Sequence, residues 1–164
     1  MKILDTWLKE KSYNIKILFI FMIMFCFGGV FFSHVYAESG KHVNVGSNKV
    51  ALSGYDTVAY FKENKAVSGD PQYQAQWKGV KWYFSTPGNR DLFKSNPQHY
   101  APQYDGNCAW SVAQGKLAHG NPIVWKIIDD KLYLNFNRPV QVNWEKDARS
   151  FIKKADANWP ALDH

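Results

Sequence analysis

An apolar run near the N-terminus divides this chain of 164 residues into an expected targeting segment and a remainder that must supply the fold. The run, Ile17–Phe32, carries no charge and follows a stretch with four lysines. As a helix it would rise only about 24 Å, which is short of the roughly 30 Å hydrocarbon core of a bilayer. A basic stretch followed by such a run is typical of a signal peptide, and Val35 and Ala37 occupy the two positions that signal peptidase recognises. We therefore expect cleavage after Ala37 and export to the periplasm or the exterior; if the segment is retained, it anchors the protein to the membrane instead.

Removal of residues 1–37 leaves one cysteine, Cys108, because Cys26 lies inside the apolar run. No intramolecular disulfide can then form, although the expected compartment is oxidising. Six tryptophans remain after residue 37, and their large apolar area can stabilise the core in place of disulfides. The formal charge of the whole chain is +6, but its basic residues are scattered and form no stripe that would follow a phosphate backbone. Nucleic acid is therefore not an expected partner.

Local patterns predict a single small domain over residues 51–164, preceded by a linker over residues 38–50. Two pairs of β-prone segments, the first joined at Gly79 and the second at Asp129-Asp130, predict antiparallel β-hairpins over residues 73–85 and 124–136. A further β-prone run, Thr57–Phe61, predicts a short strand. Thr86 followed by Pro87 predicts the start of a helix that ends near Ser95.

The remaining segments complete an α+β prediction. Residues 98–107 have the Pro, Gly and Asn content of a loop, and residues 108–114 suit a short helix capped by Asn107. From Pro139 to Trp159, apolar residues recur at helical spacing and predict one long C-terminal helix. The expected fold class is thus α+β, a small single domain with antiparallel β-hairpins, short helices and a long C-terminal helix.

The order of several motifs resembles the YHS domain family, in particular its exported branch of YHS domain-containing (seleno)proteins. The resemblance extends over nearly the whole chain after residue 37 and is carried by Gly54–Phe61 (GYDTVAYF), Gly79–Ser85 (GVKWYFS), Asn96–Tyr104 (NPQHYAPQY), Cys108-Ala109, Lys131–Asn137 (KLYLNFN) and Ala155–Pro160 (ADANWP).

The resemblance implies metal handling, because related domains of this kind are associated with metals, often copper, through cysteines. Cys108 resembles the position at which some members carry selenocysteine, which favours chemistry at this residue. The chain departs from the metal-binding pattern after the second motif, where residues 84–89 contain no thiol. It also has Asp105-Gly106-Asn107 where the family has Gly-Gly-Tyr before the cysteine.

Cys108 is the residue on which the expected function depends. At the first turn of a short helix, unpaired N–H groups and the helix dipole favour a thiolate. His99 and His119 are on segments that could fold toward Cys108, and a Cys/His set suits copper or zinc. The first hypothesis is therefore a metal-binding or redox-linked accessory module, without turnover of its own, that uses Cys108, His99 and His119.

Two alternatives remain open from the sequence. The chain could be a single-thiol oxidoreductase in which Cys108 exchanges with a small-molecule thiol, since no second cysteine is available. It could also be a non-catalytic domain with an inert Cys108 that binds a sugar or another flat ligand. The expected pocket residues, which would also surround Cys108 in the first hypothesis, are Tyr55, Tyr100, Tyr104, Asp105 and Trp110. The sequence identifies no protein partner and contains no nucleophile triad or glycine-rich phosphate loop.

Overall fold

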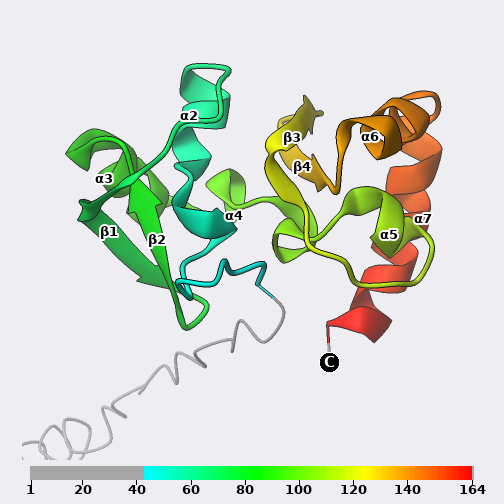
Figure 1. The fold of residues 1–164 in the computed structure, drawn as a ribbon, viewed down its shortest axis with the longest axis horizontal. Helices are drawn as coiled ribbons and strands as arrows, with labels where there is room; N and C mark the ends of the chain where they lie inside the picture. The colour runs from blue at the N-terminus through cyan, green and yellow to red at the C-terminus, as the bar shows by residue number, and fades with distance from the viewer. Residues whose placement is uncertain (1–42, 164) are drawn as a thin grey trace, which may run out of the picture. The chain divides into compact units, whose positions relative to one another are not determined.

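Two antiparallel β-hairpins organise the chain in the computed structural model, which describes residues 43–163 (Figure 1). The first pairs β1 (Asp70–Trp77) with β2 (Val80–Phe84), and the second pairs β3 (Asn121–Ile128) with β4 (Lys131–Asn135). Each connection consists of two residues with positive φ, as a two-residue hairpin turn of the primed type requires. Both predicted hairpins are confirmed. The predicted signal peptide and cleavage site lie outside the described residues.

The helical segments are short except for the last one, and several have an identifiable side-chain cap. Thr86 accepts a hydrogen bond from the backbone N–H of Asn89, which confirms the predicted helix start at Pro87. No helix within residues 43–163 has the length and apolar character needed to cross a membrane. The helical segments are η1 (Leu52–Gly54), α2 (Thr57–Lys62), α3 (Pro87–Ser95), α4 (Pro97–Tyr100), η2 (Gln103–Gly106), α5 (Ala109–Ala113), α6 (Arg138–Glu145) and α7 (Ala148–Leu162).

These elements form an α+β domain, as the sequence predicts. Figure 1 shows the first hairpin beside α2 and α3 and the second beside α5, α6 and α7, with α4 between the two groups. One buried cluster contains Trp82, Phe84 and Phe93 from the first group and also takes in Leu132 and Leu134 of β4. A second cluster packs α5 and Tyr133 against α6 and α7. Strand β4 therefore contributes side chains to both clusters and joins the two groups.

The predicted strand at Thr57–Phe61 is wrong, because this segment is the helix α2. Asp56 explains the difference: its Oδ1 accepts hydrogen bonds from the backbone N–H groups of Val58 and Ala59 and caps the helix. Its Oδ2 accepts three more, from the backbone N–H and hydroxyl of Ser85 and from the side-chain amide of Asn89. The cap and these long-range bonds outweigh the β propensity of the sequence.

Three further boundaries differ from the prediction. The segment expected as a linker belongs to the fold from residue 43 on, because Val43, Asn44 and Val50 are buried. The expected loop over residues 98–107 contains η2 and the end of α4. The expected long C-terminal helix is divided into α6 and α7, since Asp147 leaves helical geometry and caps α7 by accepting from the backbone N–H of Ser150.

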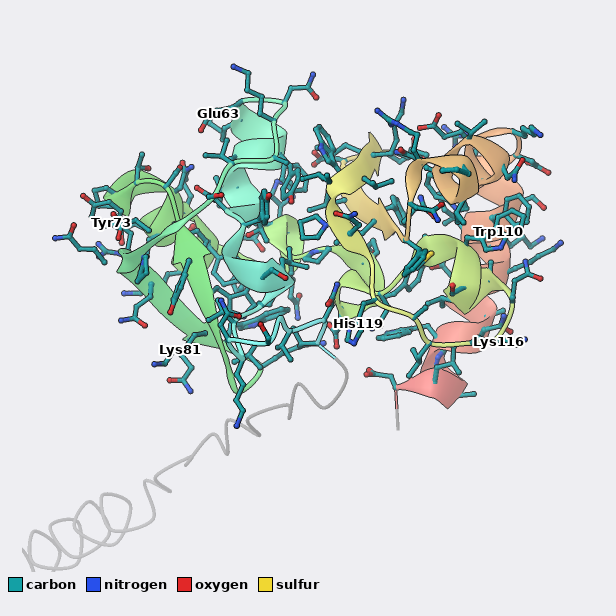
Figure 2. All side chains as sticks on the ribbon, viewed as in Figure 1. Glu63, Tyr73, Lys81, Trp110, Lys116 and His119 are labelled. Atoms are coloured by element: carbon teal, nitrogen blue, oxygen red, sulfur yellow. The ribbon has the colours of Figure 1, made fainter. Side chains whose placement is uncertain are left out.

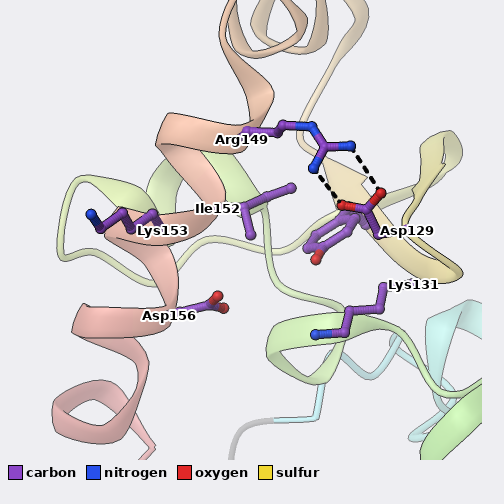
Figure 3. Close-up of a pocket in the computed structure, with 7 residues that line it drawn as sticks. Asp129, Lys131, Arg149, Ile152, Lys153 and Asp156 are labelled. Atoms are coloured by element: carbon purple, nitrogen blue, oxygen red, sulfur yellow. Dashed lines mark hydrogen bonds and ion pairs between the residues drawn. The ribbon is translucent and has the colours of Figure 1, made fainter.

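The first turns of helix α7 contact both α5 and the turn between β3 and β4. Trp110 of α5, which is labelled in Figure 2, packs on Phe151 of α7. The two ring centroids are 4.6 Å apart. Arg149 forms two contacts of 2.9 Å with the carboxylate of Asp129 in the turn between β3 and β4 (Figure 3). Both residues of this ion pair are exposed, so it adds little to stability.

The hydrogen bonds of Asp56 predict a large loss of stability on truncation. In Asp56→Ala, five donors lose their acceptor beside the buried start of α2, and we expect the free energy of unfolding to fall by about 3 kcal/mol or more. Urea unfolding followed by circular dichroism measures this change. Asp91→Ala is the matched control, because the one hydrogen-bonded partner of the Asp91 side chain within residues 43–163 is Arg90 at the surface, and its unfolding midpoint should barely move. Equal effects of the two substitutions would contradict the stabilising role of the Asp56 hydrogen bonds.

Candidate functional site

Cys108 lies at the start of a helix, as the sequence predicts, but its side chain is completely enclosed. It is the residue immediately before α5, in place of the predicted cap Asn107, which is extended and donates from its side chain to the carbonyl of Tyr104. The exposed fraction of Cys108 is 0%. Its thiol donates to Oδ1 of Asn135 across 3.8 Å, and Asn135 is also fully buried. The sulfur is therefore not accessible to a metal ion or a thiol substrate in this conformation.

The two histidines are not arranged around the sulfur as a ligand set. His99 lies between Phe61 and Tyr100, and its Nδ1 is 3.6 Å from the carboxylate of Asp130. His119 is close to Cys108 only through the backbone: it forms a bridge with Asn107, while its own side chain is exposed (Figure 2). In the part of the chain that the structure describes, no three His, Cys, Asp or Glu side chains are grouped so that they could hold a metal ion. Copper or zinc needs up to four ligands around it, and the residues at Cys108 do not fit one.

The segment before Cys108 forms a turn of three consecutive left-handed residues. Tyr104, Asp105 and Gly106 have φ values of 56°, 51° and 80°. Such values are unfavourable for Tyr and Asp, so the surroundings must hold this conformation in place. The backbone carbonyl of Asp105 accepts from Asn44 N–H at 2.8 Å, and that of Gly106 accepts from Asn44 Nδ2 at 2.9 Å. The segment that the sequence indicated as a linker thus fixes this turn.

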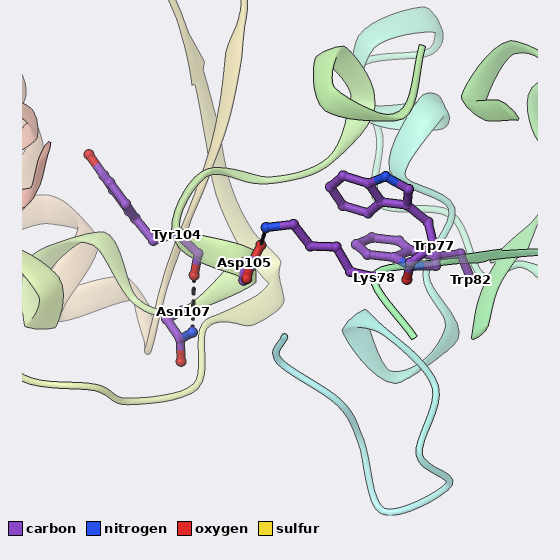
Figure 4. A network of polar contacts seen from close by, with 6 residues as sticks. All are labelled: Trp77, Lys78, Trp82, Tyr104, Asp105 and Asn107. Atoms are coloured by element: carbon purple, nitrogen blue, oxygen red, sulfur yellow. Dashed lines mark hydrogen bonds and ion pairs between the residues drawn. The ribbon is translucent and has the colours of Figure 1, made fainter. Parts of the chain in front are cut away.

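The left-handed turn directs Asp105 toward a pocket of about 210 Å³, called here the Lys78–Asp105 pocket. Asp105 is 8% exposed, and its Oδ1 accepts a hydrogen bond from Lys78 Nζ at 3.0 Å in an ion pair (Figure 4). The lysine ammonium group also lies 5.3 Å from the ring centre of Trp77. The pocket is lined by Trp77, Lys78, Gln98, Ala101, Pro102, Gln103, Tyr104, Asp105 and Trp159.

Two of the five predicted pocket residues, Tyr104 and Asp105, line this pocket and the other three do not. Tyr55 and Tyr100 pack on the first buried cluster, and Trp110 packs on α7. Sequence reasoning missed Trp77, Lys78 and Trp159, which come from a hairpin turn and from the C-terminal helix. For Trp77 and Lys78 the sequence contains one local signal, which is a lysine in a two-residue hairpin turn directly after a tryptophan. It contains no comparable signal for Trp159.

Tyr104 connects the pocket to α7 through its ring and its hydroxyl. The ring packs on Trp159 with centroids 5.7 Å apart, and the hydroxyl donates to Asp156 Oδ1 at 2.8 Å. Burial raises the pKa of the Tyr104 phenol, and the hydrogen bond and negative charge of Asp156 raise it further. Tyr104 is therefore a neutral donor at physiological pH and forms a fixed wall of the pocket.

Comparison with protein-family models gave no match, and searches of curated proteins and of solved structures found none either. The resemblance to YHS domains therefore rests on the sequence motifs alone.

The burial of Cys108 predicts that the thiol reacts only when the domain opens. We expect its modification by a thiol-reactive disulfide reagent to be slow in the native protein and to accelerate steeply with denaturant, because exposure of the sulfur requires unfolding. Cys26→Ser in the full chain isolates the signal of Cys108. The same sample, titrated with zinc with and without Cys108→Ser, should show no difference in affinity. Rapid modification in native buffer would contradict the structural role.

Three buried phenols predict a loss of stability at alkaline pH. The pKa values of Tyr60 and Tyr104 are raised above their ordinary value of 10.0, and that of Tyr133 is raised to about 12, in each case first by burial. The unfolded chain ionises these groups near pH 10 while the folded chain keeps them neutral. Their stabilising contribution is therefore complete below pH 10 and is lost as the pH rises toward 12. Urea unfolding across this range should show the decline, and Tyr133→Phe should show a smaller one; an identical decline would contradict the role of Tyr133.

Proposed function

We propose that this chain is an exported, non-catalytic binding module that holds one small polar ring, such as a monosaccharide, in the Lys78–Asp105 pocket. The proposal rests mainly on one observation: aromatic faces, side-chain amides and a nearly buried ion pair meet in a single pocket. A volume of about 210 Å³ lies below the roughly 300–1,000 Å³ of sites for drug-sized ligands, so a single ring suits it better than a chain of rings. Export follows from the N-terminal sequence pattern and is part of the proposal.

The aromatic walls supply the apolar contact that such a ring needs. Trp77 packs edge-on against Trp82 and Phe93, and Trp159 packs on Tyr104, so both indole rings are held by buried neighbours. Rings held in this way lose little conformational entropy when a ligand binds against them. The flat C–H face of a sugar ring is the kind of surface that packs well on an indole.

The polar side chains of the Lys78–Asp105 pocket would orient the bound ring. Gln98 and Gln103 line the pocket, and neither side-chain amide forms a hydrogen bond with any other residue in the range 43–163. Each amide has one acceptor oxygen and two N–H donors, which suits ligand hydroxyl groups, since these also donate and accept. Lys78 and Asp105 neutralise each other, so the pocket carries no net charge from this pair and favours a neutral ligand.

The metal-binding and thiol hypotheses have less support from the geometry. Both need the sulfur of Cys108 to meet an ion or a substrate, and its side chain is 0% exposed. Either would require the segment around α5 to open first. The Lys78–Asp105 pocket needs no such opening, and none of its lining residues is Cys108, His99 or His119.

Titration calorimetry of the purified chain with glucose, galactose and N-acetylglucosamine tests the proposal. We expect saturable binding of at least one sugar with a dissociation constant in the millimolar range, as is reasonable for a small ligand in a small pocket. Gln98→Ala removes an exposed amide without disturbing the core, and Trp159→Ala removes one aromatic wall. Each should weaken binding, the tryptophan substitution by about tenfold or more.

Trp110→Ala is the matched control, because Trp110 also packs on α7 but does not line the pocket. It should leave the affinity unchanged. The proposal fails if none of the three sugars binds, or if the Trp110 substitution weakens binding as much as the Trp159 substitution does. A normal unfolding midpoint for Gln98→Ala ensures that at least one variant reports on the pocket and not on folding.

A further inference from the structure

A second pocket, of about 250 Å³, lies between the β3–β4 turn, the start of β4 and helix α7 (Figure 3). Its lining is strongly polar and differs from that of the Lys78–Asp105 pocket. Three cationic side chains line it, from Lys131, Arg149 and Lys153, together with the carboxylates of Asp129 and Asp156. Nothing in the proposed sugar binding uses these groups.

The charges of this pocket are only partly neutralised. Arg149 and Asp129 are paired with each other through two contacts of 2.9 Å. Asp156 accepts a hydrogen bond from the Tyr104 hydroxyl at 2.8 Å. Lys131 and Lys153 form no ion pair with any residue of the described range, 43–163. The pocket therefore has one positive charge more than its carboxylates neutralise, and two lysines that can turn toward a ligand.

Tyr133 is the observation that indicates what the pocket receives. The residue is 2% exposed, and its ring packs against Tyr104 and Trp144 at centroid distances of 5.9 and 5.7 Å. It nevertheless lines the pocket, and its hydroxyl forms no hydrogen bond within the described chain. The hydroxyl is not one of the buried polar atoms of the described residues that lack a partner, because it opens onto the pocket, so a ligand that accepts from it takes the place of water.

The protonation state of Tyr133 fits the role of a donor. Burial, followed by the charges of Asp156 and Asp129, raises its pKa to about 12. The phenol is therefore neutral and carries its proton throughout the physiological range. A neutral O–H in a pocket that is also lined by two lysines suits an acceptor that is negatively charged.

We propose that this pocket binds a small oxyanion, a phosphate or carboxylate group, which accepts a hydrogen bond from the Tyr133 hydroxyl and is held by Lys131 and Lys153. A metal cation is disfavoured by the excess positive charge and by the engagement of Asp129 with Arg149. The site is separate from the Lys78–Asp105 pocket, and neither proposal requires the other.

Titration of the purified chain with inorganic phosphate and, separately, with acetate tests the site. Sodium chloride keeps the ionic strength constant, so that general screening does not imitate binding. We expect saturable calorimetric binding of at least one anion; a preference for phosphate identifies a phosphoryl ligand, and a preference for acetate identifies a carboxylate. Tyr133→Phe keeps the packed ring and removes only the donor, and it should weaken binding by about tenfold.

The lysines provide a matched pair of substitutions on one helix. Lys153→Gln should weaken binding several-fold, whereas Lys154→Gln removes the same charge from the next residue, which lies over Phe151 and outside the pocket, and should leave the affinity nearly unchanged. Equal effects of the two would overturn the proposal, because they would indicate attraction by overall charge only. Absence of saturable binding to both anions, or unchanged affinity in a folded Tyr133→Phe variant, would also overturn it.

Discussion

The left-handed turn over Tyr104, Asp105 and Gly106 is the constraint on which most of the remaining structure depends. A Cβ atom added at Gly106 would lie 2.6 Å from Leu52 Cδ2, so the backbone there approaches its neighbour as closely as it can. The Gly106 carbonyl accepts from Asn44 Nδ2 and from the backbone N–H of Gly120, which joins three distant segments. The turn places the Asp105 carboxylate within hydrogen-bond distance of Lys78 and the Tyr104 hydroxyl within that of Asp156. Cys108, two residues after the turn, is buried in the core.

Local signals in the sequence were enough to predict the two hairpins and the helix that begins at Pro87. Two-residue turns such as Asp129-Asp130, and a Thr-Pro pair at a helix start, act through their immediate neighbours and need no tertiary information. The same kind of signal was present at Asp56 but was outweighed in the prediction by the β-prone residues after it. What decides that segment is the set of bonds to Ser85 and Asn89, which only the folded chain supplies.

The candidate site shows where sequence reasoning stops. The position of Cys108 at a helix start was predictable because it depends on a few adjacent residues. Its enclosure depends on Leu134 and Asn135 of a strand later in the chain, and no periodicity in the sequence reports that contact. Likewise, Trp77 and Trp159 meet around one pocket only because the turn at residues 104–106 brings a hairpin and the last helix together.

Helix α7 contributes lining residues to both pockets, so the division of the C-terminal segment into α6 and α7 bears on both proposed sites. Asp156 lines the pocket beside Lys131 and Lys153, and Trp159, which follows it by about one helical turn, lines the Lys78–Asp105 pocket. Tyr104 lines the Lys78–Asp105 pocket, and its hydroxyl donates to Asp156 of the other pocket, so this hydrogen bond connects the two pockets. Trp144 of α6 is fully buried in the second cluster, whereas Asp156 and Trp159 of α7 each line a pocket. The break capped by Asp147 allows the two helices to be oriented independently, and α7 is then positioned by its ion pair with Asp129 and its contacts with Tyr104.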